Sequence, residues 1–188
     1  MIKIGITGSL ASGKTSASKI LSYKKGPVFD ADKVVKKLYQ NKNFKQQLIK
    51  KFKIVKKTYF KNSIREKILK NKNNIKILEK IIHPLVRREM KKFSSINKDK
   101  KTLFYEIPLL IENKLLNYFD VIIFIKAKKK LRLKRFKAKG GSKNLFNILN
   151  NKQLPDKKKA KLSDHVVVNE KNFYILKKNL ISIMKLYE

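Results

Sequence analysis

The stretch Gly8-Ser9-Leu10-Ala11-Ser12-Gly13-Lys14-Thr15 decides the fold of this chain, because it fits the phosphate-binding pattern G-x-x-x-x-G-K-[ST]. Residues 1–7, which precede it, are rich in β-branched side chains and favour a buried strand. Residues 16–21, which follow it, combine small side chains with an apolar pair and favour a helix. A strand, a glycine turn and a helix in this order form the context that the pattern requires.

Each fixed position of this loop has a chemical reason. Gly8 and Gly13 allow backbone angles that other residues rarely adopt, so successive N–H groups can converge on phosphate oxygens. The start of the following helix adds partial positive charge. Lys14 can reach the β- and γ-phosphates, and the Thr15 hydroxyl can bind Mg²⁺. The alternative, a glycine-rich turn before an ordinary helix, is disfavoured because the motif and its flanks agree.

The formal charge of +36, from 49 Lys and Arg against 13 Asp and Glu, raises the question of nucleic-acid binding. The lysines are spread from Lys3 to Lys185 and far outnumber the arginines. Nucleic-acid sites favour arginine for bidentate contacts and intersperse aromatic residues for stacking. Abundant Lys, Asn and Ile instead indicate A/T-biased coding on a solvated surface. We expect no specific nucleic-acid partner, only adventitious binding at low salt.

Length and composition favour one domain with an insertion, since 188 residues can bury a substantial core. The chain has no cysteine, which excludes disulfides and thiolate metal sites. It opens on a predicted strand without the features of a signal peptide, and its longest aliphatic run, residues 121–125, is too short to span a bilayer. These features predict a soluble cytoplasmic protein with no membrane partner.

Two carboxylates, Asp30 and Asp32, end the second predicted strand, which spans residues 27–32. In open α/β sheets, ligands bind outside the carboxyl ends of the strands, so one of these acids would lie near the terminal phosphate. Alternatively, Asp32 caps a helix over residues 33–39. A capping carboxylate can also accept a substrate proton, and the spacing favours neither role.

Residues 41–95 show the period of amphipathic helices with lysine-rich faces. His83 precedes Pro84, which predicts a local break in the helix. A lone histidine is more often structural than functional. The alternative is that His83, with Arg65, Arg87 and Arg88 nearby, helps to line an anionic pocket.

Three further strands are predicted: one that begins at residue 103 and leads into a turn by residue 112, one at residues 120–125 and one at residues 164–169, followed by a closing helix. Glu106 lies in an apolar stretch and would be costly to bury unless it is paired or faces a polar site. Strands that alternate with helices predict a three-layer α/β domain around a parallel sheet.

A basic helix is predicted at residues 129–139, and Gly140-Gly141-Ser142 ends it. Glycines beside a basic segment suit a mobile cover over phosphate. A plain surface loop fits this pattern equally well.

Taken in series, five motifs resemble those of the dephospho-coenzyme A kinase family of P-loop kinases. The resemblance covers nearly the whole chain and includes the order and the intervals of the motifs. They are residues 5–15, Asp30-Ala31-Asp32, His83-Pro84-Leu85-Val86-Arg87, Pro108-Leu109-Leu110-Ile111-Glu112 and residues 164–169.

The resemblance implies a single P-loop kinase domain with the α/β fold of the P-loop nucleoside-triphosphate hydrolases. Its expected parts are a core at about 1–40, 96–136 and 161–188, a helical substrate-binding insertion at about 41–95 and a lid at about 137–160. It also implies transfer of the γ-phosphate of ATP, with Mg²⁺, to the ribose 3′-hydroxyl of dephospho-CoA. This is the last step of coenzyme A biosynthesis, and we expect a monomer to perform it.

The resemblance also implies roles for individual residues. Asp32 would take the proton of the 3′-hydroxyl with Asp30 beside it, Lys14 would act on the phosphates, and Arg135 would stabilise the transferring phosphoryl group. The expected ATP-binding residues are Gly8, Ala11, Ser12, Gly13, Lys14, Thr15, Ser16 and Asn169, with Thr15 also a ligand of Mg²⁺. The expected substrate-binding residues are Asp30, Asp32, Arg65, His83, Pro84, Arg87 and Glu106.

The sequence departs from the family pattern at the loop and the lid. Gly8-Ser9-Leu10-Ala11 replaces a Gly-Gly-Ile-Gly segment, a tolerable change because only the outer glycines of the motif are fixed. Lys139 and Asn147 stand where the family has lid arginines; lysine loses the bidentate geometry, and asparagine also loses the charge. Either lid closure is weaker, or Lys137 and Lys143 substitute.

Two other functions remain open from the sequence. One is a different small-molecule kinase of the nucleoside-monophosphate type, which a panel of acceptors would separate. The other is a basic nucleic-acid-binding ATPase, which predicts hydrolysis stimulated by DNA or RNA and a steep salt dependence of binding.

Overall fold

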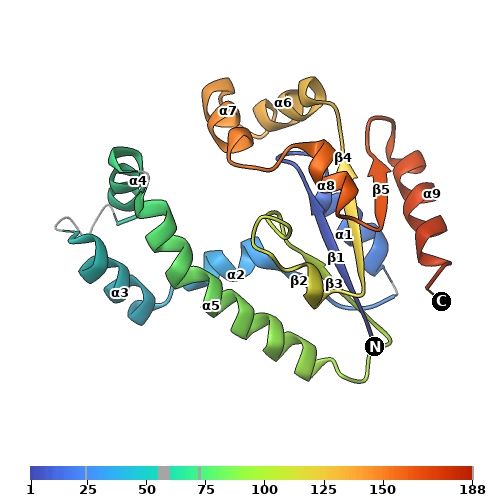
Figure 1. The fold of residues 1–188 in the computed structure, drawn as a ribbon, viewed down its shortest axis with the longest axis horizontal. Coiled ribbons are helices and arrows are strands. Elements are labelled where there is room, and N and C mark those ends of the chain that lie inside the picture. The colour runs from blue at the N-terminus through green and yellow to red at the C-terminus, as the bar shows by residue number, and fades with distance from the viewer. Residues whose placement is uncertain (24, 55–59, 72, 188) are drawn as a thin grey trace. The chain divides into compact units, whose positions relative to one another are not determined.

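The computed structural model describes residues 1–23, 25–54, 60–71 and 73–187. The chain divides into two compact units, one of Met1–Asp30 with Asn97–Glu188 and one of Ala31–Ile96. The first, called the sheet unit below, holds every strand that the structure describes, and the second, the helical unit, consists of helices and their connections (Figure 1).

The sheet unit is built on five parallel strands in the order β2-β3-β1-β4-β5, which confirms the predicted α/β fold. β1 lies in the middle, with Gly5 opposite Tyr105 on one side and Ile122 on the other. The strands are β1 (Ile2–Gly8), β2 (Val28–Asp30), β3 (Thr102–Glu106), β4 (Val121–Lys126) and β5 (His165–Val168). Nearly continuous apolar runs form the three central strands because both of their faces are buried.

Helices of the sheet unit cover the strands and connect them (Figure 1). They are α1 (Lys14–Ser22), the 3-10 helix η2 (Leu116–Tyr118), α6 (Lys129–Lys137), α7 (Lys143–Asn151), α8 (Asp156–Lys161) and α9 (Phe173–Met184). The core against α1 and α9 contains Ile4, Ile6, Ala17, Leu21, Phe104, Val121, Ile123, Ile125, Val167, Leu176, Leu180 and Met184. On the opposite face, a Cβ at Gly5 would lie 2.6 Å from Leu110 and 3.0 Å from Phe119, so a larger residue at this position would require these side chains to shift.

The helical unit consists of α2 (Ala31–Leu38), α3 (Lys42–Phe52), α4 (Phe60–Lys70) and α5 (Asn73–Ile96). Its apolar faces meet in one cluster, as the predicted amphipathic period requires. The buried members of that cluster are Phe44, Leu48, Phe52, Ile54, Ile64 and Leu78. The expected insertion at about 41–95 falls within this unit.

The predicted helix break before Pro84 is wrong, because α5 runs through this residue from Asn73 to Ile96. A proline inside a helix removes one backbone hydrogen bond and crowds the preceding turn. Side chains on both sides of Pro84, among them Ile81 and Leu85, pack against the same apolar cluster. Tertiary packing therefore holds the helix together across the proline.

The second carboxylate, Asp32, lies in the first turn of α2 rather than at the cap position, since the helix begins at Ala31. A carboxylate there interacts favourably with the helix dipole.

In the described ranges, no helix has both the length and the apolar character needed to cross a bilayer.

Candidate active site

The phosphate loop leaves the C-terminal end of β1 and enters α1. Ala11, with φ 58°, and Gly13, with φ 101°, turn the chain back into the helix. The side-chain nitrogen of Asn169 occupies the place that a Cβ at Gly13 would take, so a glycine is needed there. The first hydrogen bond of α1 runs from Ala17 N–H to Gly13 O at 3.0 Å. The backbone N–H groups of residues 14–16 therefore lie before the first hydrogen-bonded turn of the helix.

The carbonyl of Ser12 anchors the second half of the loop. It accepts hydrogen bonds from Asn169 Nδ2 at 2.8 Å and from Arg135 Nη1 at 3.3 Å. Lys14 Nζ donates to Gly8 O at 3.1 Å and to the next carbonyl at 3.2 Å. Because these oxygens are engaged, the loop holds a shape in which successive N–H groups can converge on an anion.

Glu106 lies at the end of β3 and is only 5% exposed. Its Oε1 accepts from Thr15 Oγ1 at 2.6 Å, and its Oε2 accepts from Ser18 Oγ at 2.7 Å. Asp30 is its neighbour in the sheet, because the two residues pair in the register of β2 and β3. The condition set by the sequence, that a buried Glu106 must be paired, is met by two hydroxyls of α1.

Arg132 of α6 ties several segments to the first half of the loop. Nε donates to Ala127 O at 3.0 Å, and Nη1 donates to Leu10 O at 3.3 Å and to Asn150 Oδ1 at 2.7 Å. Nη2 lies 3.9 Å from Asp156 Oδ2. Burial lowers the pKa of Arg132 and Asp156 opposes this change, but a guanidinium stays protonated near neutral pH.

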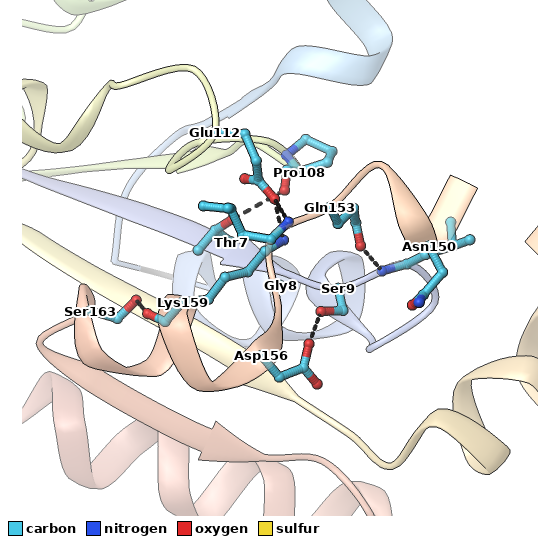
Figure 2. A network of polar contacts seen from close by, with 12 residues as sticks. Thr7, Gly8, Ser9, Pro108, Glu112, Asn150, Gln153, Asp156, Lys159 and Ser163 are labelled. Carbon is cyan, nitrogen blue, oxygen red and sulfur yellow. Dashed lines mark hydrogen bonds and ion pairs between the residues drawn. The ribbon is translucent and has the colours of Figure 1, made fainter. Parts of the chain in front are cut away.

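Residues around α8 also contact the loop (Figure 2). Ser9 Oγ donates to Asp156 Oδ1, and Leu10 N–H donates to Gln153 Oε1 at 2.8 Å. Lys159, which is fully buried, forms an ion pair with Glu112 at 2.7 Å. The hydrogen bonds of Ser9 and Leu10 join the loop to a segment that is more than 140 residues away in sequence.

The helical unit carries the other predicted site residues. His83 and Arg87 are four residues apart on α5 and share one face of it. Burial lowers the pKa of His83, Glu79 raises it, and Arg87 lowers it, with burial the largest effect. Arg65 on α4 and Asp32 on α2 are exposed, as are Pro84 and Arg87. Asp32 belongs to the helical unit, whereas Asp30 belongs to the sheet unit.

The two positions of the expected lid arginines lie on either side of a glycine turn. Lys139 is exposed just after α6, and Asn147 is half-buried on α7. Phe136 and Phe146 pack with ring centroids 5.7 Å apart, and Gly141 lies against Phe136 where a Cβ would overlap the ring. Aromatic packing thus connects α6 to α7.

The structure brings one set of the predicted residues together in the sheet unit: Gly8, residues 11–16, Asp30, Glu106, Arg135 and Asn169. Sequence reasoning gave no site role to the supports of this loop: Ser18, Arg132, Gln153, Asp156 and Lys159. Ser18 could have been found, since it lies one helical turn after Thr15. The buried lysine could not, because nothing in the sequence separates it from the exposed ones.

Comparison with known proteins gives a consistent result. The family model described as dephospho-CoA kinase matches residues 2–174. The dephospho-CoA kinase of Bartonella quintana is 32% identical over 187 residues, 97% of this chain and 96% of that protein. The dephospho-CoA kinase of Zymomonas mobilis is 31% identical over 94% of this chain and 91% of that protein.

Solved structures agree on the fold. The crystal structure of TT1252 from Thermus thermophilus superposes with a TM-score of 0.85 at 26% identity and covers 98% of this chain and 97% of that one. The dephospho-CoA kinase of Campylobacter jejuni gives a TM-score of 0.69 at 24% identity over 97% and 95% of the two chains. A shikimate kinase of Bacteroides thetaiotaomicron, at 0.56 and 11% identity over 98% and 97%, shares the fold alone. With its loop geometry and a family match along most of its length, the chain belongs to the dephospho-CoA kinase family.

Proposed function

We propose that this protein is a dephospho-CoA kinase, which transfers the γ-phosphoryl group of ATP to the ribose 3′-hydroxyl of dephospho-CoA. The bond from the γ-phosphorus to the β,γ-bridging oxygen breaks, a bond to the 3′-oxygen forms, and the hydroxyl proton leaves. The products are CoA and ADP. The proposal is carried by a phosphate loop joined to Glu106 through Thr15, in a chain that matches this family from residue 2 to 174.

Residues 11–16 are the proposed ATP-binding stretch. Their amides lie at the start of α1, where N–H groups and the helix dipole favour phosphate. The ammonium of Lys14 is held inside the turn by two loop carbonyls and supplies positive charge beside the phosphates. Asn169 is proposed to face the adenine, a role that follows from the resemblance; its bond to Ser12 O places it at the loop.

The residues at Thr15 fit a magnesium ion. The hydroxyl donates its hydrogen to Glu106, so its oxygen lone pairs remain available to a cation. Mg²⁺ prefers oxygen ligands and keeps several waters, with phosphates as partners. In the part of the chain that the structure describes, no three His, Cys, Asp or Glu side chains could hold a metal together. A cation here would depend on phosphate oxygens, whose charge it would neutralise when bound.

Arg135 is the proposed group that stabilises charge on the transferring phosphoryl. Its Nη1 donates to Ser12 O at 3.3 Å, which holds the guanidinium against the loop. A guanidinium has five N–H donors in a planar fork, and this bond uses one of them.

Asp32 is the proposed base that accepts the proton of the 3′-hydroxyl. It is exposed in the first turn of α2, where a carboxylate is favoured by the helix dipole. Asp30 is the second candidate, since it pairs in register with Glu106, the partner of Thr15.

The residues proposed to bind dephospho-CoA are the ones that the resemblance implies: Asp30, Asp32, Arg65, His83, Pro84, Arg87 and Glu106. The lowered pKa of His83 favours the neutral ring at pH 7, so we assign it hydrogen bonding rather than charge pairing. Arg65 and Arg87 are then the cations that meet the acceptor phosphates.

The direct test is to incubate the purified protein with MgATP and dephospho-CoA and to measure CoA and ADP. We expect both products in equal amounts. Absence of CoA at micromolar enzyme would contradict the proposal. AMP and shikimate serve as control acceptors, because turnover with either at a comparable rate would favour the alternative of another small-molecule kinase.

The oligomeric state, the location in the cell and nucleic-acid binding can each be tested separately. We expect a monomer in the cytoplasm with no specific nucleic-acid partner. Sedimentation would test the first expectation and cell fractionation the second. ATP hydrolysis without acceptor, with and without DNA or RNA, tests the third, and a strong stimulation would contradict it.

A further inference from the structure

The segment from Asn150 to Ser163, called the clamp segment, crosses the first half of the phosphate loop. Gln153 and Asp156 contact the loop directly, and Asn150 does so through Arg132. Much of this segment belongs to the region expected to act as a lid. Its bonds to the loop indicate that this part of the expected lid is fixed to the sheet unit.

The clamp segment is anchored by a buried ion pair. Of the basic side chains in the described part of the chain, Arg132 and Lys159 are the buried ones. Figure 2 shows Lys159 directed from α8 toward Glu112, whose Oε1 lies 2.7 Å from Nζ and also accepts from Leu154 N–H at 3.0 Å. Taking an ammonium out of water is costly unless its partner is well placed. The pair fixes α8 and residue 154 to the turn that follows β3.

The loop residue that these contacts surround is strained. Ala11 has φ 58°, a conformation that is unfavourable for residues with a side chain. The preceding residue is held at both polar groups, since Leu10 N–H donates to Gln153 and Leu10 O accepts from Arg132. The following residue is held through the carbonyl of Ser12. The neighbours on both sides thus hold Ala11 in its left-handed conformation.

We propose that the clamp segment sets the affinity for ATP by holding the strained turn at Ala11 in its binding shape, with Gln153 as the main positioning residue. This rests on the proposed function, in which residues 11–16 bind ATP. Without the Gln153 acceptor, Leu10 N–H loses its partner and the peptides around Ala11 can rotate. The amides of the loop then no longer converge before the nucleotide arrives, and part of the binding free energy is spent on ordering them.

The test measures the dissociation constant for MgATP by calorimetry and the kcat for CoA formation in the same variants. Gln153→Ala should weaken MgATP binding by about fivefold, the effect of one lost hydrogen bond, with kcat at saturating ATP nearly unchanged. Asn151→Ala is the matched control, because Asn151 is exposed on the same stretch and outside these contacts. It should bind MgATP as the wild type does.

The decisive variant is Ala11→Gly combined with Gln153→Ala. Glycine adopts a positive φ without strain, so the double variant should bind MgATP more tightly than Gln153→Ala alone. A role limited to stability predicts a lower melting temperature for Gln153→Ala with unchanged MgATP affinity. That result, or no rescue by glycine, or equal weakening in Asn151→Ala, would overturn the proposal. Calorimetry with MgATP needs no acceptor, so the result stands apart from whether dephospho-CoA is the substrate.

Discussion

The phosphate loop and the helical unit both carry candidate anion-binding groups, but they are built differently. Around the loop, Glu106, Arg132 and Lys159 are buried and bonded to fixed partners. In the helical unit, the charged candidates Asp32 and Arg87 are exposed. Buried charges must be paired, which fixes their geometry before a ligand arrives. Exposed side chains such as that of Arg87 are less restricted by packing than buried ones, so a ligand that binds them must restrict them further. We therefore expect the half around the phosphate loop, proposed to bind the nucleotide, to be preorganised, and the half proposed to bind the acceptor to be ordered by its ligand.

The largest expected effect is at Asp32, the proposed base. Asp32→Asn should lower kcat by about 10²–10⁴-fold, the usual range for loss of a general base, with little change in MgATP affinity. Asp30→Asn is the comparison variant, because it changes the other acid of the same motif. Circular dichroism checks that Asp32→Asn is folded. Wild-type turnover in the folded variant would leave Asp32 with a structural role only, in the first turn of α2. A larger loss in Asp30→Asn would transfer the role to Asp30.

The second expected effect is in the preorganised half. Glu106→Gln keeps the shape but removes the charge beside Thr15, and should weaken Mg²⁺ binding about 10–100-fold, as loss of a residue that orients a metal ligand does. The measurement is activity against Mg²⁺ concentration at fixed ATP. Ser18→Ala is the control, since it removes the other hydrogen bond of Glu106 and leaves the one from Thr15. Equal Mg²⁺ requirements in wild type and Glu106→Gln would restrict Glu106 to a structural role.

A third, smaller effect concerns the acceptor half. Arg87→Ala should raise the KM for dephospho-CoA about tenfold, as expected for a lost charged hydrogen bond, and leave the KM for ATP near its wild-type value. Arg88→Ala is the matched control, because it removes the same charge from the adjacent, exposed position. Identical losses in both variants would reduce the effect to general electrostatic attraction and remove Arg87 from the pocket.

The smallest expected effect is the pH dependence of stability at His83. Its pKa is lowered in the folded protein, mainly by burial, so the unfolded chain binds the proton more strongly. Stability therefore falls as pH decreases from the ordinary histidine pKa, about 6.5, toward the lower folded value. Melting temperatures of wild type and His83→Gln between pH 5 and 7.5 measure this, and the glutamine variant should lose less stability on acidification. Parallel curves would contradict a lowered pKa.

The sequence was sufficient for the features that depend on local pattern. The phosphate loop, the five strands and the amphipathic helices followed from spacing and residue type, and the structure confirms them. The requirement that a buried Glu106 be paired was also visible. Its partners were not, because Thr15 lies 91 residues away and only the parallel pairing of β3 with β1 brings the two together.

Features that depend on tertiary packing could not be predicted. The rule that proline ends a helix failed at Pro84, because packing on both sides outweighs one lost hydrogen bond. Lys159 looks like any other lysine of a chain with 49 basic residues, and its burial follows only from the position of Glu112. The expected roles of Asp32 and Arg87 remain predictions that the experiments above decide, and the role of Arg65 also remains a prediction.

Arg132 has a consequence for how this protein can change. Most basic residues of this chain are lysines, including Lys139, a position at which the family resemblance implies an arginine. Lysine cannot replace Arg132 without losing contacts, because one planar guanidinium donates to Ala127 O, Leu10 O and Asn150 Oδ1 at once. A lysine ammonium is a single point and cannot span three such acceptors. At position 132 the shape of the side chain, and not its charge alone, therefore limits which residue the phosphate loop can accept as a support.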